Sequence, residues 1–374
     1  MMAGSGGKLA APGGVAGAAV AAAAGPVAPE LEAALGSRFT LAVVDPASPA
    51  ASFAEEVRAG LAALPKHLPC RFFYDEEGSR LFEQICTLPE YYVTRAERQV
   101  LERYADEIVA QLPVPVTLVE LGSGSAAKTR LLIDALLRRQ PALRYVPLDI
   151  SRSALEESAR SLLAIYPRLR VDAVAAEYGD GLRYLADQEV LAAGGGQPKL
   201  ILWLGSNVGN LDRQAAAAFL RRVRAGMGLN DRLLLGVDRR KARAMLEPAY
   251  DDAQGATARF NKNLLARINR ELGGHFDLDA FAHRAVYDEV AGRIAMYLVS
   301  MRAQVVPIDA LDLAVRFAAG EAIHTEDSYK YSDEEIAALA AAAGFAVERQ
   351  WYDPCRWFCD CLLRPLAAAA GSAA

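Results

Sequence analysis

The sequence predicts an α/β fold in which a second, smaller α+β domain is inserted into a doubly wound, mostly parallel sheet of seven strands. Between residues 117 and 237, apolar β-branched runs alternate with amphipathic helical runs, as in successive βαβ units. After residue 239, two helical runs precede long alternating segments, which are typical of antiparallel strands.

The chain begins with a segment of low complexity. Residues 1–29 are nearly all Ala, Gly, Val and Pro, and Lys8 is their only charged side chain. An export signal would have a more basic start and a longer leucine-rich centre, so we expect disorder here, and also in the tail 366–374. Residues 64–97 concentrate prolines, glycines and aromatic residues, which suits a folded cap whose aromatic side chains face a cleft.

The remaining elements follow from hydrophobic period. After a helix at 96–112, we expect strands at 117–121, 144–150, 171–178, 200–205 and 232–237, with helices at 128–139, 154–165, 181–192 and 211–227. The insertion should hold helices at 243–250 and 257–272 and strands at 285–290, 293–306 and 311–317. A helix capped by Ser332 and ended by Gly344 returns the chain to the sheet, which closes with an antiparallel hairpin of 345–352 and 356–363.

Composition excludes several classes of function. The 41 basic and 46 acidic residues give a formal net charge of -5, so we expect no nucleic-acid partner. Apolar runs are too short to cross a bilayer, so no membrane partner is expected. The five cysteines form no C-x-x-C pair, which favours a reduced, cytoplasmic chain without structural zinc.

Residues 116–130, V-T-L-V-E-L-G-S-G-S-A-A-K-T-R, combine a buried strand, a glycine loop and a helix start. The glycines let a ligand approach bare backbone, and the helix offers free N–H groups. The loop also satisfies the dinucleotide pattern G-x-G-x-x-G/A, so a nicotinamide cofactor is one alternative. Glu120 before the first glycine and the terminal antiparallel hairpin favour a Rossmann-like class I methyltransferase instead.

The cofactor would then be S-adenosylmethionine. We expect Gly122, Ser123 and Gly124 to contact its methionine part, and Asp149 its ribose. The end of the third strand, Glu177 or Tyr178, would contact the adenine. Lys128 either reaches the carboxylate of the cofactor or pairs with an acidic side chain. The alternative to these two roles is a solvated charge on the helix.

A second motif, L-G-S-N-V-G-N-L, follows the fourth strand, where methyltransferases place groups near the transferred methyl. Asn207 and Asn210 offer neutral amides that can bind an amine or a carboxylate. Asn210 is also well placed to cap the helix that follows.

Several long motifs in order give the sequence a specific resemblance. F-F-Y-D-E-E-G-S-R-L-F-E-Q-I, L-P-E-Y-Y-V-T-R-A-E, E-L-G-S-G-S-A-A-K-T-R, L-G-S-N-V-G-N-L, A-Y-D-D-A-Q-G-A-T-A-R-F-N and H-T-E-D-S-Y-K-Y-S resemble the histidine-specific methyltransferase family. Its best-known members are L-histidine Nα-methyltransferases, which trimethylate histidine to hercynine in ergothioneine biosynthesis. The resemblance therefore implies S-adenosylmethionine as methyl donor and S-adenosylhomocysteine as product.

The resemblance also implies a division of the chain. Residues 30–96 and 239–330 would form a substrate-binding domain, and residues 97–238 and 331–365 the domain that binds S-adenosylmethionine. We expect a monomer whose partner is a small molecule, namely its amino-acid substrate.

The family pattern also assigns the substrate site by motif position. Tyr74, Asn210 and Tyr250 would hold the amino and carboxylate end of the amino acid, with Tyr74 guiding the reacting amine. Glu326 and Ser328 would bind the imidazole, and the family pattern places Tyr91 and Met296 near the substrate as well. Without the family pattern, the two early tyrosines could be core aromatics and Glu326 an exposed loop acid.

Two departures from the family pattern leave the substrate open. Ala295 stands where the family usually has an acidic residue, and D-S-Y-K-Y-S differs from the S-C-K-F ending of actinobacterial histidine enzymes. Tryptophan or tyrosine are therefore alternatives to histidine. A nicotinamide-dependent oxidoreductase and a non-catalytic S-adenosylmethionine-binding protein are the alternatives from other classes. Of the four histidines, His67, His275, His283 and His324, none matches a catalytic position, and no metal site is expected.

Overall fold

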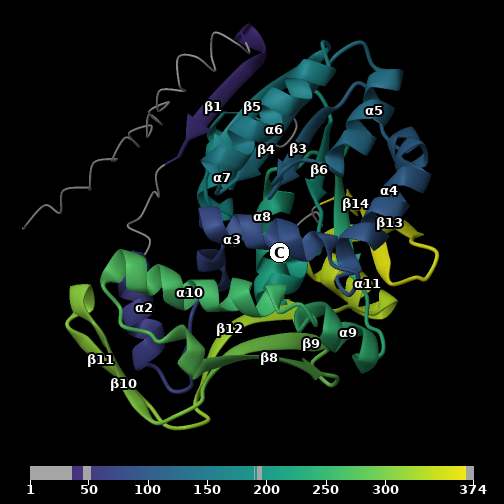
Figure 1. Ribbon diagram of the computed structural model, residues 1–374. Helices are drawn as coiled ribbons and strands as arrows, with labels where there is room; N and C mark the ends of the chain where they lie inside the picture. Colours follow the sequence, from purple (N-terminus) through teal and green to yellow (C-terminus); the bar gives the residue numbers. More distant parts are fainter. Residues whose placement is uncertain (1–35, 45–51, 189, 192–195, 368–374) are drawn as a thin grey trace, which may run out of the picture.

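The computed structural model describes residues 36–44, 52–188, 190–191 and 196–367 (Figure 1). The disorder predicted for residues 1–29 and for most of the tail falls outside these ranges. In Figure 1 a large sheet occupies the upper part of the molecule, and a smaller sheet with α10 lies below it.

The large sheet has eight strands among the described residues, in the order β1-β5-β4-β3-β6-β7-β14-β13. Its first six strands run parallel, and β14 and β13 add an antiparallel hairpin at the far edge. The seven predicted strands are all present, which confirms the predicted Rossmann-like α/β fold. They are β3 (Thr117–Leu121), β4 (Leu143–Asp149), β5 (Leu169–Ala175), β6 (Lys199–Trp203), β7 (Arg232–Asp238), β13 (Phe345–Tyr352) and β14 (Phe358–Pro365).

One edge strand of this sheet was not predicted. β1 (Phe39–Val43) pairs in parallel with β5, so part of the segment 30–96 belongs to the large sheet. The division of the chain into a substrate domain and a cofactor domain stays a prediction.

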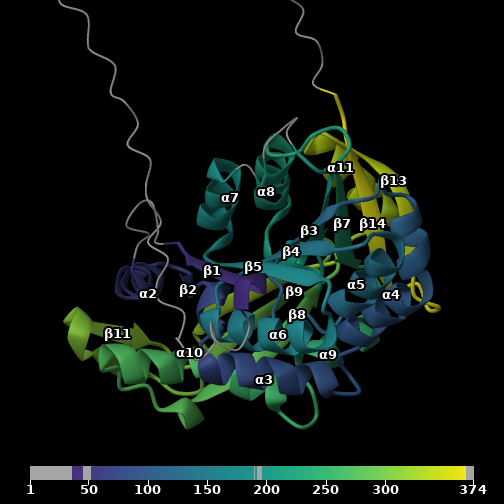
Figure 2. The same ribbon diagram turned by 90° about the horizontal axis from the view of Figure 1, so that it is seen from above.

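Helices cover both faces of the large sheet, as Figure 2 shows from above. One face packs against α4 (Val93–Ala110), α5 (Thr129–Arg139) and α6 (Arg152–Ile165), and the other against α7 (Tyr178–Asp187), α8 (Arg213–Ala225) and α11 (Asp333–Ala342). Because both faces are covered, the central strands are apolar on both sides. Every residue of β3 and β6 is buried.

The smaller sheet has the order β2-β12-β9-β8. Its strands are β2 (Lys66–His67), β12 (Ala322–Tyr329), β9 (Arg293–Ser300) and β8 (Phe281–Asp288), beside a separate hairpin of β10 (Gln304–Ile308) and β11 (Leu313–Phe317). The strand predicted at 293–306 is therefore wrong as a single element, because the chain turns between β9 and β10. Neither β2 nor β12 was predicted.

The smaller sheet shares one hydrophobic core with helices from two distant parts of the chain. These are α2 (Phe53–Ala62), just before the cap, and α3 (Glu76–Thr87) of the cap, together with α9 (Arg243–Tyr250) and α10 (Ala256–Leu272) from the insertion. Phe73 of the cap stacks on Phe260 of α10, with ring centroids 4.5 Å apart. Across the described ranges, no helix is both long and apolar enough to pass through a bilayer.

Candidate active site

A cavity opens where the smaller sheet and the cap meet the carboxyl end of β6. This is the edge at which open α/β sheets bind their ligands. All seven residues that the family pattern assigns to the amino acid line it, namely Tyr74, Tyr91, Asn210, Tyr250, Met296, Glu326 and Ser328. Its other lining residues are Phe82, Ile85, Gly205, Ser206, Asn207, Ala249, Thr257 and Phe260.

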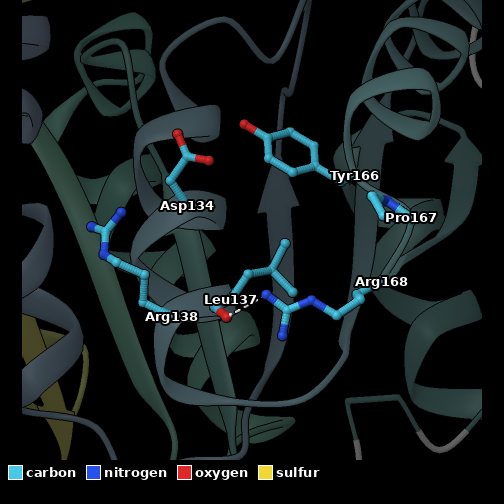
Figure 3. Close-up of a pocket in the computed structure, with 6 residues that line it drawn as sticks. All are labelled: Asp134, Leu137, Arg138, Tyr166, Pro167 and Arg168. Atoms are coloured by element: carbon cyan, nitrogen blue, oxygen red, sulfur yellow. Dashed lines mark hydrogen bonds between the residues drawn. The ribbon is translucent and has the colours of Figure 1, made fainter.

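A second, more open pocket lies at the other end of the strands, on the amino-terminal side of the sheet (Figure 3). It lies between the C-terminal half of α5 and the loop that precedes β5. Its Arg168 is already engaged, since the guanidinium donates to the carbonyl of Leu137 at 2.8 Å. Because this pocket faces the amino ends of the strands, we do not assign the reaction to it.

Aromatic rings build one wall of the cavity near β6. Tyr74 packs edge to face on Phe82 and Phe260, with centroids 5.7 and 5.8 Å away, and Tyr91 packs on Tyr250 at 6.1 Å. The hydroxyls of Tyr74 and Tyr91 form no hydrogen bond with any described residue. Burial raises the pKa of both phenols well above the ordinary value, so both stay protonated at neutral pH. The cavity therefore has neutral hydroxyls free to meet a ligand.

Tyr250 is held from behind by a buried histidine. His283 Nε2 donates to the backbone carbonyl of Tyr250 at 2.8 Å, which leaves Nδ1 to accept from Asn261 Nδ2 at 2.9 Å. Burial lowers the pKa of His283, so its ring is neutral. The expectation that this histidine is structural agrees with its position behind the cavity wall.

Strand β12 forms another wall of the cavity. Alternate residues of a strand share a face, so Glu326 and Ser328 both reach the cavity. Burial raises the pKa of Glu326 to about 7, and the nearby Lys330 ammonium opposes this shift. Glu326 is thus a strand residue that faces the cavity and not an exposed loop acid.

Asn210 lines the cavity from η3 (Asn207–Asn210). The helix after it, α8, is capped by Asp212, whose carboxylate accepts from the Ala215 N–H at 2.7 Å. Capping therefore does not occupy Asn210, and its amide is available to a ligand.

The glycine loop lies beside this cavity. Gly122 has a φ of +75°, and a Cβ there would collide with the Tyr178 hydroxyl and lie 3.1 Å from Asn207 Nδ2. Gly124 has a φ of +49° and donates its N–H to Asp149 Oδ2 at 2.8 Å. Only glycine fits the first of these positions without displacing a neighbour.

Glu120 is buried beneath the loop. Its carboxylate accepts from Thr129 Oγ1 at 2.7 Å and from the Tyr145 hydroxyl, while burial raises its pKa to about 7. It therefore ties β3 to β4 and to the start of α5, and it shapes the loop from below.

Lys128 pairs with an acid, which was one of its two predicted roles. Its ammonium contacts Glu97, a fully buried residue of α4 whose other oxygen accepts from the Gly205 N–H at 2.7 Å. Burial disfavours the charged lysine, but Glu97 outweighs it and raises the pKa of Lys128. Lys128 is thus held as a cation beside the start of the loop after β6.

At the end of β5, Glu177 and Tyr178 take different positions. Glu177 Oε1 lies 3.4 Å from Nε of Arg71 in the cap, and its side chain remains 43% exposed. Tyr178 packs on Phe219, with centroids 5.4 Å apart, and points its hydroxyl at the glycine loop. The cap therefore contacts the edge where the adenine was predicted.

The comparison with protein families decides between the cofactors. A family model described as histidine-specific methyltransferase, SAM-dependent, matches residues 53–365. The chain belongs to this family. It is an S-adenosylmethionine-dependent N-methyltransferase, and the nicotinamide-dependent alternative is excluded.

Individual members of the family are similar over most of the chain. A histidine N-alpha-methyltransferase of Mycolicibacterium smegmatis is 43% identical, over 82% of this chain and 93% of that protein. The protein of the same name from Mycobacterium tuberculosis is also 43% identical, over 80% of this chain and 90% of that protein. Ergothioneine biosynthesis protein 1 of Neurospora crassa is 33% identical over 77% of this chain, which spans 32% of that longer protein.

The residues of the methyltransferase loop fit S-adenosylmethionine. Ser123 Oγ is buried and has no hydrogen-bond partner among the described residues, so a polar ligand can satisfy it. The missing Cβ of Gly122 leaves room between the loop and the Tyr178 hydroxyl. Each carboxylate oxygen of Asp149 accepts one backbone N–H, from Gly124 and from Ser151. Each oxygen keeps a further lone pair that can accept from a ribose hydroxyl.

Proposed function

We propose that this protein methylates the α-amine of free L-histidine, in successive steps that end at hercynine. One observation carries the proposal. The Tyr250 hydroxyl, assigned to the carboxylate end, lies 2.9 Å from Ser328 Oγ, assigned to the imidazole end, and Glu326 follows on the same face of β12. Such closely spaced polar groups suit a free amino acid whose carboxylate and polar ring are near each other.

S-adenosylmethionine, when bound, supplies a methyl group on a sulfonium sulfur, which is already a good leaving group. Catalysis by the protein is therefore mainly alignment and exclusion of water. Gly122, Ser123, Gly124 and Asp149 would hold the methyl donor, with Lys128 and Tyr178 beside them. No covalent intermediate on the protein is required.

The amine must lose a proton before it can react, since the pKa of a free α-amine is roughly 8. Tyr74 is the candidate that guides it. As a neutral phenol its oxygen can accept one amine N–H and leave the nitrogen lone pair directed at the methyl group. Asn210 and Tyr250 would hold the carboxylate with neutral donors, which adds no negative charge to stabilise the protonated amine.

Glu326 and Ser328 match the two nitrogens of a neutral imidazole. An ionised Glu326 accepts from the ring N–H, and the Ser328 hydroxyl can donate to the other nitrogen. Met296 packs from β9 without adding a polar group. This pairing favours histidine over tryptophan, which has a single ring N–H and no ring acceptor.

Neither departure from the family pattern touches the cavity. Ala295 precedes Met296 on β9, so it faces the opposite side of the strand, and Tyr329 alternates away from Ser328 to lie against Arg213. We therefore keep histidine first and the other aromatic amino acids as the alternative.

The test is a methylation assay with labelled S-adenosylmethionine and a panel of free amino acids that includes histidine, tryptophan and tyrosine. We expect histidine to be methylated most efficiently and the product mass to show three added methyl groups. If only tryptophan or tyrosine is methylated, that amino acid and not histidine is the substrate. If S-adenosylmethionine binds and no amino acid is methylated, the non-catalytic alternative is supported.

We further propose that the protein is cytoplasmic and monomeric, and that it acts on a free amino acid without a nucleic-acid or membrane partner. The cysteines support the compartment, since all five, Cys70, Cys86, Cys355, Cys359 and Cys361, are free thiols. Light scattering of the purified protein checks the oligomeric state.

A further inference from the structure

Lys330 is a fully buried lysine directly behind the substrate cavity. It follows the last residue of β12 and has no exposed surface. Its ammonium lies 2.7 Å from the Tyr250 hydroxyl, 2.9 Å from Ser328 Oγ and 2.8 Å from Asp238 Oδ2. An ammonium has three N–H donors, so these three acceptors use all of them.

This arrangement fixes how two hydroxyls of the cavity are used. Because Tyr250 Oη and Ser328 Oγ both accept from Lys330, neither oxygen can turn its own proton toward the lysine. The two oxygens are 2.9 Å apart, and only one proton fits between them. At least one O–H must therefore donate to a ligand, and the positive charge behind it strengthens that donation.

The backbone around Lys330 is equally fixed. Its N–H donates to the carbonyl of Gly292 at 2.7 Å, and its own carbonyl accepts from the Arg213 guanidinium at 2.7 Å. Asp238 is the last residue of β7, so the ion pair joins the smaller sheet to the large one. The ammonium thus has a defined position relative to both parts of the cavity.

We propose that Lys330 is a positioning residue that directs the hydroxyls of Tyr250 and Ser328 toward the ligand as hydrogen-bond donors, and that through Tyr250 it selects a ligand with a carboxylate. The identity of that ligand rests on the proposed function. The inference itself requires only a free amino acid, whichever side chain it carries.

Lys241 is a matched control for Lys330. Its ammonium contacts the same Asp238 and lies 2.7 Å from the Tyr92 hydroxyl, yet it contacts neither Tyr250 nor Ser328. A loss that came only from weakening the buried charge cluster would appear in Lys241→Met as well as in Lys330→Met.

The experiment compares histidine with histamine, which lacks the carboxylate, by calorimetry in the presence of S-adenosylhomocysteine. In Lys330→Met we expect roughly 10- to 100-fold weaker binding of histidine, the range for a lost hydrogen bond supported by a charge. The loss for histamine should be clearly smaller, because histamine has no carboxylate to meet Tyr250 and keeps only its ring contact with Ser328. Lys241→Met should leave both affinities near wild type, and neither variant should weaken S-adenosylhomocysteine binding. Equal losses for histidine and histamine in Lys330→Met, or the same histidine loss in Lys241→Met, would overturn the proposal.

A buried aspartate that loses one of its two lysine partners can prevent folding. If Lys330→Met does not fold, the double variant Asp238→Asn/Lys330→Met removes both charges together and should show the same loss of selectivity for the carboxylate. If the wild type rejects histidine but methylates another amino acid, the proposed function fails. The comparison then uses that amino acid and its decarboxylated amine, and an unchanged ratio of affinities in the variant would overturn the role of Lys330.

Discussion

Glu326 shows at the scale of one residue how the site is built at the expense of stability. Its pKa is raised to about 7 by burial, so the folded protein without ligand favours the protonated acid. Between the ordinary carboxyl pKa and about 7, the folded state binds more protons than the unfolded chain. The unliganded protein therefore loses stability as the pH rises through this window.

Glu326→Gln is expected to separate stability from substrate binding. Above about pH 7 the variant should have a higher melting temperature than the wild type, because no charge has to be buried. It should also raise the KM for histidine roughly 10-fold, since the acceptor for the ring N–H is weakened. The affinity for S-adenosylhomocysteine should not change, and a parallel loss of both ligands would contradict the assigned role.

The same variant gives a test by pH. In the wild type, KM for histidine should rise as the pH falls from about 8 to about 6, because protonation of Glu326 removes its charge and makes it a weaker acceptor for the ring N–H. In Glu326→Gln only the titration of the substrate itself should remain. Identical pH profiles for the two proteins would show that Glu326 does not titrate in the relevant range.

At this scale, the substrate-site residues are predicted by family motifs more than by hydrophobic period or residue spacing. The resemblance assigns Glu326 and Ser328 but no role to Lys330, which stands two residues after Ser328 and directly follows the end of β12. The spacing of two was the available signal. It was not used because β12 itself was not predicted.

The decisive element is the unit of β3, glycine loop and α5. The strand was predicted with its exact bounds, and the helix start within one residue, because a run of buried β-branched residues and a following glycine are strong local signals. β12 carries polar residues that face a cavity, and a bulge between His324 and Glu326 interrupts its alternation. Period alone could not reveal such a strand.

Gly122→Ala tests the loop as an element. The new methyl would collide with the Tyr178 hydroxyl, in addition to roughly 1–2 kcal/mol of backbone strain from the positive φ. Gly124→Ala is the control, because its φ is also positive but, apart from its chain neighbours, no atom of the described residues lies within 4 Å of the added Cβ. We expect Gly122→Ala to bind S-adenosylhomocysteine clearly more weakly than Gly124→Ala, with partial recovery when Tyr178→Phe is added. Equal losses, without recovery, would show that the collision is unimportant.

At the scale of the whole molecule, we expect the methyl donor and the amino acid to meet at Asn207. This residue lines the substrate cavity, and its amide lies 3.1 Å from the position of a Cβ on Gly122. One side chain therefore borders both ligand positions. The sequence predicts the two motifs after the first and the fourth strand of the series, and only the strand order of the fold shows that these strands, β3 and β6, are neighbours.

We expect this contact to couple the two ligands. Histidine should bind about 5-fold or more tightly in the presence of S-adenosylhomocysteine, and the reverse experiment must give the same factor. Asn207→Ala should bring the factor close to one. Asn210→Ala should weaken the binding of histidine but keep the coupling, because Asn210 lines the cavity and is not among the residues near Gly122. Calorimetry in both orders measures the factor, and unchanged coupling in Asn207→Ala would exclude this route.

The shared core of the cap and the insertion has a consequence for synthesis on the ribosome. Residues 53–96 bury their apolar side chains against residues 246–323, so the cap must wait, unburied, until most of the chain has been made. The parallel strands β3 to β7 are complete long before that. The core that buries the cap is therefore complete only after these parallel strands have been made. The hairpin of β13 and β14, which completes the large sheet, is synthesised later still.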